Sequence, residues 1–175
     1  MSDAPAPLML AEIAHFLRAA ATTLAVELSG VPPRLLAWHP ARGEWCAKEV
    51  VGHLIEAERR GFAGRIRIML EGREPRLETW DQDAVAAARR DCERDGGELL
   101  GEFATLRQDS VRLVERLLGA DLSRGAEHPK VGHLTVSDIL NEWVHHDRNH
   151  IRQILANLQA YVWPHMGNAQ RFSRP

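Results

Sequence analysis

Two histidines spaced four residues apart, His146 and His150, are the residues whose types and spacing best suit chemistry. They lie in residues 135–158, TVSDILNEWVHHDRNHIRQILANL, which have the periodicity of an amphipathic helix. At about 100° per residue, both histidines fall on one apolar face, whereas His145 points about 120° away, to a polar face. The apolar residues of that face are Ile139, Trp143 and Ile154. Side chains four apart on a helix lie about 5–6 Å apart at Cβ, so both imidazoles can reach one metal ion.

A third histidine, His53, lies on the predicted core face of another helical segment, over about residues 44–70. Three neutral imidazoles meeting in a bundle core would leave an open position for water or substrate. Nitrogen ligands suit zinc, nickel or another divalent transition ion better than magnesium or calcium. If the two helices are neighbours, we expect a metal site at His53, His146 and His150. The alternative is that these histidines are packed core residues.

Two other kinds of metal site fit the sequence less well. A di-iron bundle needs Glu-x-x-His motifs that face the core, but in both such motifs here the histidine, His15 or His145, lies off the core face. A zincin needs His-Glu-x-x-His with glutamate as general base. Here Asp147 follows His146, one methylene shorter, which leaves that role open. The loop histidine His133 is predicted to be exposed and not a further ligand.

Four long helices are predicted to position these residues. Helical spacing of apolar residues extends over 8–29, 44–70, 81–118 and 135–158, and Gly96-Gly97 can divide the third segment. Loops rich in glycine and proline separate them, no strand alternation is evident, and the residues after Leu158 are predicted to dock irregularly over one end. We predict an all-α four-helix bundle, as one domain over residues 1–175.

The second segment has a core face and a polar face by the 3.6-residue count. The predicted core face carries Val50, His53, Leu54, Ala57, Gly61, Gly64 and Ile68. The opposite face is predicted to be solvated and carries Glu56, Arg59, Arg60 and Arg67. Glycine costs about 1 kcal/mol within a helix, so close backbone approach or room for a ligand would explain the two glycines.

Composition excludes several classes of function. The 22 basic and 24 acidic residues give a net charge of −2, which provides no basic surface for nucleic acid. No segment approaches the roughly 20 apolar residues of a membrane span, and residues 1–10 lack the features of a signal peptide. Cys46 and Cys92 match no zinc or redox spacing, which argues against a disulfide framework. We expect a soluble, cytoplasmic protein that acts on a small molecule.

Two motifs, in order, resemble the DinB/YfiT-like superfamily. Residues 44–54, EWCAKEVVGHL, resemble its W-(S/T)-x-x-(E/D)-x-x-x-H-(L/I) pattern, with Cys46 where serine or threonine usually caps the helix. Residues 132–135, GHLT, followed by His146-Asp147-x-x-His150-x-x-Gln153-Ile154, resemble its fourth-helix signature. The resemblance spans nearly the whole chain. It implies a four-helix bundle, a metal held by His53, His146 and His150, and often a homodimer.

The resemblance also implies an activity. Family members are largely metal-dependent thiol transferases or isomerases that use bacillithiol, mycothiol or glutathione, and the metal lowers the pKa of the thiol. An anionic thiol would need cations at the pocket mouth, for which Arg65, Arg148 and Arg152 are candidates. No protein nucleophile is needed, and Cys46 is predicted to have a packing role.

Two alternatives stay open. One is a metal-dependent hydrolase in which Asp147 or Glu56 assists water, and the other is a non-catalytic, stress-associated bundle dimer. Glu56, Asp147 and Asn149 are also candidates to hold the histidine rings in position.

Overall fold

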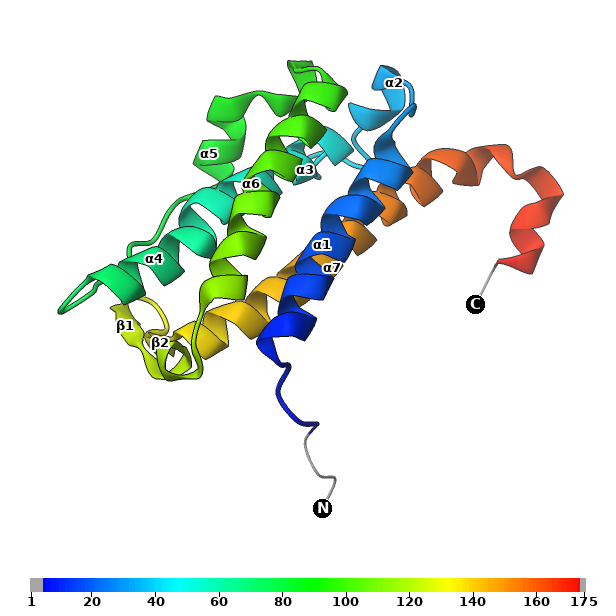
Figure 1. Ribbon diagram of the computed structural model, residues 1–175. Helices are drawn as coiled ribbons and strands as arrows, with labels where there is room; N and C mark the ends of the chain where they lie inside the picture. Colours follow the sequence, from blue (N-terminus) through cyan, green and yellow to red (C-terminus); the bar gives the residue numbers. More distant parts are fainter. Residues whose placement is uncertain (1–4, 174–175) are drawn as a thin grey trace.

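Four long helical segments form a bundle in the computed structural model, which describes residues 5–173 (Figure 1). They are α1 (Leu10–Leu28), α3 with α4 (Ala47–Glu56 and Ala63–Glu71), α6 (Gly96–Arg116) and α7 (Val136–Val162). The predicted all-α four-helix bundle is confirmed. None of the helices within residues 5–173 has an apolar stretch of the length that a membrane crossing needs.

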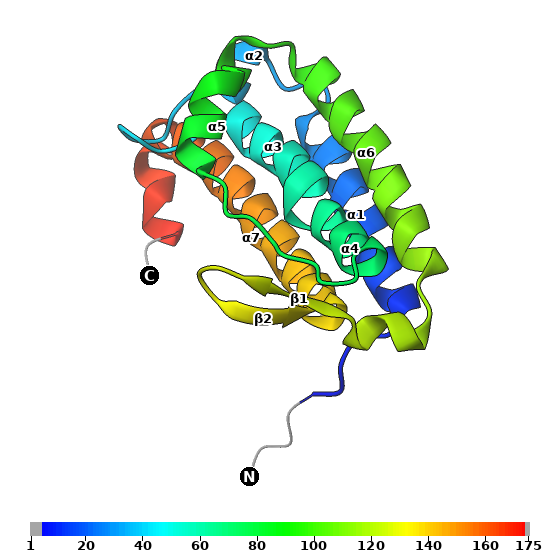
Figure 2. The same cartoon turned by 90° about the vertical axis from the view of Figure 1, so that its left-hand side faces the viewer.

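The order of the helices around the bundle differs from their order in the chain. Both α1 and α3 pack against α6 and α7, so α1 and α3 are diagonal to each other. A long connection that includes α5 (Gln82–Arg89) returns the chain to the end of the bundle where α3 begins. As a result, α3–α4 and α6 run in the same direction, as Figure 2 shows.

Short elements connect the long helices. A single helical turn, α2 (Pro33–Leu36), follows α1, and a 3₁₀ turn (Asp91–Glu93) follows α5. After α6, a 3₁₀ turn (Gly119–Ser123) leads to an antiparallel hairpin of β1 (Gly125–His128) and β2 (Gly132–Thr135). The hairpin was not predicted, because four residues in each strand are too few to show alternation.

A capping box formed by Thr135 and Asp138 begins α7. Thr135 Oγ1 accepts a hydrogen bond from the Asp138 amide at 3.1 Å, and Asp138 Oδ2 accepts one from the Thr135 amide at 2.8 Å. These bonds satisfy amides at the helix start that have no partner within the helix. The helix continues to Val162, past the predicted end at residue 158.

A π-helical turn (Ala57–Gly61) separates α3 from α4 and changes which residues face the core. The Phe62 amide bonds to the Ala57 carbonyl at 2.8 Å, which closes a turn one residue wider than in an α-helix. The extra residue advances the following helix by about 100°. The prediction that Ile68 faces the core is therefore wrong: Ile68 is 43% exposed, and Ile66 and Met69 are buried instead.

The π-helical turn also explains why a glycine stands at position 64 within the helical segment. A Cβ atom at this position would lie 2.2 Å from the Arg59 carbonyl oxygen, so close approach of backbone requires glycine here. The approaching backbone belongs to the preceding turn of the same helical segment and not to a neighbouring helix.

The bundle core consists of two apolar clusters with a polar layer between them. One cluster includes Leu17, Phe62 and Trp143, and the other includes Leu24, Leu54 and Ile154. Between them lie the buried charged side chains Glu58 from the π turn, Arg107 from α6 and Asp147 from α7. Every long helix except α1 contributes a charged side chain to this layer.

The two cysteines form a disulfide that joins the residue before α3 to the Asp91–Glu93 turn. The expectation drawn from their spacing is therefore wrong. Cys46 and Cys92 are separated by 46 residues, and it is the return of the chain through α5 that brings them together. Cys46 is fully buried, which agrees with the packing role predicted for it.

The segment after α7 projects from the bundle, as Figure 1 shows. It forms two 3₁₀ turns (Trp163–His165 and Gly167–Phe172), and Phe172 is 93% exposed. The prediction that this segment docks over one end is wrong. The end of α7 does pack on the first loop, because Tyr161 lies edge-on against Trp38 with ring centroids 5.3 Å apart.

Candidate metal centre

The three predicted histidines meet between α3 and α7. His53 is in the last turn of α3, and His146 and His150 occupy successive turns in the middle of α7. Nε2 of His53 lies 2.9 Å from Nε2 of His146, and one nitrogen from each of the three rings lies within 4.8 Å of the others. The structure therefore places together the residues that the sequence singled out. That they bind a metal stays a prediction.

Aromatic side chains enclose His53 and His146. Trp45 and Trp80 lie against the His53 ring, with centroids 5.1 and 5.8 Å away, and the Trp80 ring is stacked on it. Phe62 meets His146 edge-on at 4.9 Å. These rings replace water around the imidazoles with apolar surface, which disfavours their charged forms.

The pKa values of the histidines reflect this burial. Burial, together with the nearby His150, lowers the pKa of His53 to about 4. Burial and the other two imidazoles lower the pKa of His146 to about 2. Burial also lowers the pKa of His150, against the opposing effects of Gln153 and Asp147. All three rings are thus neutral at pH 7, the form in which a ring nitrogen can bind a metal.

Hydrogen bonds orient only part of the cluster. His150 Nδ1–H donates to Gln153 Oε1 at 2.9 Å, which leaves the Nε2 lone pair of His150 available. Among the described residues, the buried Nδ1 of His146 has no hydrogen-bond partner. A donor set of three convergent neutral nitrogens fits a divalent transition metal.

Gln153, which contacts His150, is a residue of the candidate site that sequence reasoning did not single out. It occurs in the motif quoted above, three residues after His150 and therefore on the same side of the helix. Asn149, which was a candidate for this role, instead contacts His145 at 3.3 Å.

The two carboxylates considered as bases are engaged elsewhere. Asp147 is buried and forms a two-pronged ion pair with Arg107. Glu56 was predicted on a solvated face, but it is 3% exposed and pairs with Arg60 at 2.5 Å and Arg89 at 2.8 Å. The prediction for Glu56 failed because α5 folds back over this side of α3. His133 is exposed beside Glu127 and does not join the cluster, as predicted.

Ion pairs and hydrogen bonds connect the polar layer beside the site, although Arg107 Nε has no partner among the described residues. Arg107 Nη2 lies 2.5 Å from Glu58 Oε1, and Arg107 Nη1 also donates to the Leu17 carbonyl of α1 at 3.1 Å. Glu58 accepts further hydrogen bonds from Ser110 and, at 3.2 Å, from Trp143 Nε1. Burial raises the pKa of Glu58, although Arg107 and Ser110 oppose this effect. The layer ties α7 to the rest of the bundle at the level of His146.

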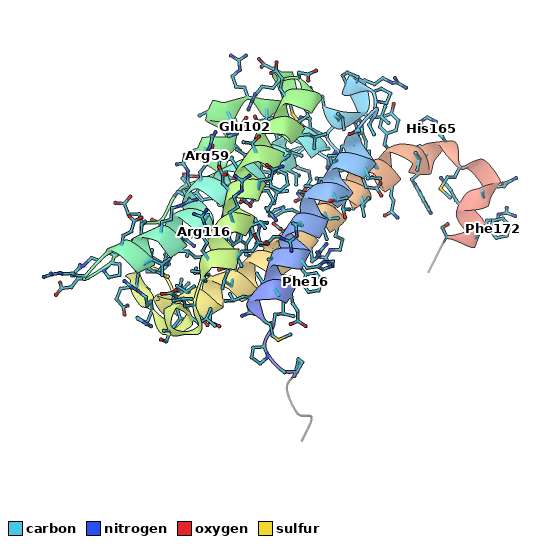
Figure 3. All side chains as sticks on the ribbon, viewed as in Figure 1. Phe16, Arg59, Glu102, Arg116, His165 and Phe172 are labelled. Carbon is cyan, nitrogen blue, oxygen red and sulfur yellow. A yellow bond between two sulfur atoms is a disulfide. The ribbon has the colours of Figure 1, made fainter. Side chains whose placement is uncertain are left out.

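A groove of about 550 Å³ has Trp80, the side chain stacked on His53, as part of its wall. It is lined by Arg59, Arg60, Gly64, Arg65, Ile68, Arg76, Glu78, Thr79 and Trp80. Arg59 lies near Glu102 of α6, as Figure 3 shows, and the two form an ion pair at 2.8 Å.

The three arginines predicted at the pocket mouth have different positions. Arg65 lines the groove and donates to His128 of the hairpin at 3.3 Å. Arg152 lies in a second hollow together with His150. Arg148 packs over the Phe16 ring and donates to the Phe16 carbonyl, so it supports the contact between α7 and α1.

Comparison with known proteins gives two results. The family profile described as the DinB superfamily matches residues 15–154. The fold is similar to that of YfiT from Bacillus subtilis, with a TM-score of 0.81, 19% sequence identity, and 93% of each chain covered. That protein is described as a probable metal-dependent hydrolase with an unusual four-helix bundle topology. No curated protein matches the sequence.

Proposed function

Because the chain belongs to the DinB superfamily, we propose that it is a metal-dependent transferase that activates a low-molecular-weight thiol. His53, His146 and His150 would hold a divalent transition metal, zinc or nickel. The observation that carries this proposal is the meeting of three neutral imidazole rings in one partly buried cluster. A divalent cation bound there would lower the pKa of a coordinated thiol or water and so supply a nucleophile at neutral pH.

Residues of the chain hold this cluster in place. Gln153 fixes the ring of His150, and the Arg107 to Asp147 pair fixes the turn of α7 between His146 and His150. Trp45 and Trp80 cover the His53 ring and keep water from it. Such support matters because ligands must keep their geometry for a metal to bind tightly.

A thiol suits the site better than water as the nucleophile. A free thiol has a pKa of about 8.5 and water about 15.7, so a thiol ionises beside a cation without a general base. Among the described residues, the buried carboxylates nearest in sequence to the three histidines are Glu56, Glu58 and Asp147. Each of them is paired with arginine, and none is free to act as a base.

The arginine-lined groove fits an anionic thiol cofactor. Arg65 and Arg76 line it, and neither forms an ion pair with a carboxylate of residues 5–173. Trp80 belongs both to the groove and to the wall of His53. A cofactor whose carboxylates contact these arginines would extend past Trp80 toward the histidines.

Hydrolysis is the second candidate, because the structurally similar YfiT carries that description. In this chain it would need a base other than the paired carboxylates. Homodimerisation and a cytoplasmic location, expected from the sequence, stay predictions.

Metal analysis and turnover assays together test the proposal. Tag-free protein prepared without chelators is analysed for zinc and nickel as wild type, His53→Ala, His146→Ala and His145→Ala. His145 is the matched control, because it is an exposed histidine of the same helix. With the Cys46–Cys92 disulfide intact, we expect one metal per chain in wild type and His145→Ala, and little in the other two.

The same proteins are then assayed with an electrophile plus glutathione, bacillithiol or mycothiol, and with activated esters without thiol. Thiol-dependent loss of the electrophile that needs His53 supports the transferase. Ester turnover without thiol supports the hydrolase instead. Wild-type protein that cannot be loaded with zinc, nickel or manganese would refute both and leave a bundle with core histidines.

A further inference from the structure

A second group of metal-binding side chains lies at the other end of α3, about two helical turns from His53. It consists of His39, Cys46, Glu49 and Cys92, each of which places one donor atom within 4.8 Å of the others. His39 comes from the loop after α2, Cys46 and Glu49 from the start of α3, and Cys92 from the turn after α5. The proposed function uses none of these residues.

The His39 ring is oriented with a nitrogen lone pair toward the sulfur atoms. Its Nδ1–H donates to the Glu44 carbonyl at 2.8 Å, which leaves Nε2 unprotonated and 3.5 Å from Cys92 Sγ. Histidines that bind metals commonly donate their second ring nitrogen to a backbone carbonyl in this way. Zinc bond lengths of about 2.0 Å to nitrogen and 2.3 Å to sulfur place a nitrogen ligand and a sulfur ligand of a tetrahedral site about 3.5 Å apart. The measured separation is close to that value.

The donor set is one that zinc prefers. Two cysteine sulfurs, one imidazole nitrogen and one carboxylate oxygen are all common zinc ligands. Cys46 also lies at the N-terminus of α3, where the helix dipole favours a thiolate over a thiol. In the disulfide form the sulfurs are bonded to each other, so the same two atoms cannot serve as thiolate ligands.

The segment that carries Cys92 is held on α3 without help from the disulfide. Lys48 Nζ donates to the carbonyls of Cys92 at 3.1 Å and Arg94 at 2.6 Å. The neighbouring Asp91 is buried and pairs with Arg89 at 2.7 Å. Gly52 permits this contact, because a Cβ atom there would lie 1.8 Å from Asp91 Oδ2. Reduction would therefore leave both thiols close together.

We infer that His39, Cys46, Glu49 and Cys92 form a second zinc site that is available only when the Cys46–Cys92 disulfide is reduced. A dithiol reductant supplies two electrons and two protons, the S–S bond breaks, and the reductant leaves as its own disulfide. Zinc binding then releases the two thiol protons to solvent as two Zn–S bonds form. In a reducing compartment, where thiols persist, the dithiol form would predominate.

The test uses protein in which the three-histidine cluster has been removed by His146→Ala and His150→Ala. Metal-free samples are prepared oxidised, or reduced with a phosphine that is removed under argon, and are then given zinc and desalted. We expect no bound zinc in the oxidised sample and one equivalent in the reduced sample. Adding Cys92→Ser should abolish that equivalent, whereas adding His133→Ala, a distant exposed histidine, should leave it unchanged.

Cobalt provides a readout that does not depend on the folding of the double variant. Reduced wild-type protein loaded with cobalt should show an intense thiolate-to-cobalt charge-transfer band, which three imidazoles cannot produce. The oxidised protein should lack it. The inference is overturned if the reduced double variant binds no zinc, if the oxidised one binds as much, or if the reduced wild type binds cobalt without this band.

Discussion

Arg107→Met should destabilise the bundle more than any exposed substitution on α6. Arg107 is 2% exposed and contacts Asp147 through both of its Nη atoms. It also pairs with Glu58 and donates to the Leu17 carbonyl. Methionine would fill much of its volume but would leave two buried carboxylates without a cation. Breaking a buried pair in this way costs about 3–5 kcal/mol. In a chain of this size, each kcal/mol shifts the Tm by about 2–4 °C, so we expect a loss of about 6–20 °C.

The loss should depend on pH in a definite direction. Burial already raises the pKa of Glu58 in the wild type, and without Arg107 this pKa would rise further above its value in the unfolded chain, because the cation would no longer oppose the effect of burial. A group whose pKa is raised by folding stabilises the protein at low pH, and this stabilisation is lost as pH rises through the raised pKa. The loss of unfolding free energy in Arg107→Met, relative to the wild type, should therefore be larger at about pH 7 than at about pH 5.

Urea unfolding of metal-free protein, followed by far-UV circular dichroism at both pH values, measures this effect. The matched control is Arg112→Met on the same helix, because Arg112 is exposed and, within residues 5–173, its ion pair is with the exposed Asp109. The control should change the free energy of unfolding by less than about 0.5 kcal/mol. A loss below about 1 kcal/mol for Arg107→Met, or an equal loss at both pH values, would refute the reasoning from burial.

Three further predictions follow from the structure, and a fourth follows from the family resemblance. In Gly64→Ala, the new Cβ would meet a carbonyl of the π turn, and the cost of this clash should exceed the roughly 1 kcal/mol that alanine normally gains over glycine in a helix. The variant should therefore be less stable than the wild type, and equal or higher stability in urea unfolding would contradict this. Folding lowers the pKa values of His53 and His146, so metal-free protein should keep its full stability above about pH 6.5. As the pH falls toward about 4, the free energy of unfolding should drop by up to about 1.4 kcal/mol per pH unit for each histidine. The variant with both His53→Leu and His146→Leu should show a flatter dependence of unfolding free energy on pH. Gln153→Ala should weaken zinc binding about 10- to 100-fold through loss of its bond to His150, which competition with a chromogenic chelator would measure, and unchanged affinity would exclude this positioning role. Light scattering should give the mass of a homodimer, and a monomer mass at all concentrations would overturn that expectation.

Helical period made the bundle and the inward faces of the three histidines predictable, whereas their meeting was expected from the family resemblance. The apolar stripe of α7 fixes where His146 and His150 point. His53 comes before the π turn, so the extra residue of that turn does not change the face on which His53 lies. Ile68 follows that turn and was assigned to the wrong face. An extra residue in a helix leaves no mark in composition, and only a count of the realised hydrogen bonds reveals it.

Contacts made by the connection through α5 could not be predicted from local pattern. Glu56 becomes buried because Arg89 reaches it across that connection, and Cys92 reaches Cys46 by the same route. Residues 1–4 and 174–175, which the single-domain prediction includes, lie outside the described residues. Asp147 was recognised as a polar residue beside the histidines, but its partner Arg107 lies 40 residues away on α6.

The helix order has a consequence for how the chain folds. Contacts of α1 are chiefly with α6 and α7, which begin at Gly96 and Val136, so no hairpin of α1 and α3 can form early and persist. His53 and His146 are 93 residues apart, and the three-histidine cluster exists only after α7, the last long helix, has docked. Folding rates fall as contacts become more distant in sequence. We therefore expect this bundle to fold more slowly than one of equal length whose successive helices are neighbours, and stopped-flow refolding would measure the difference.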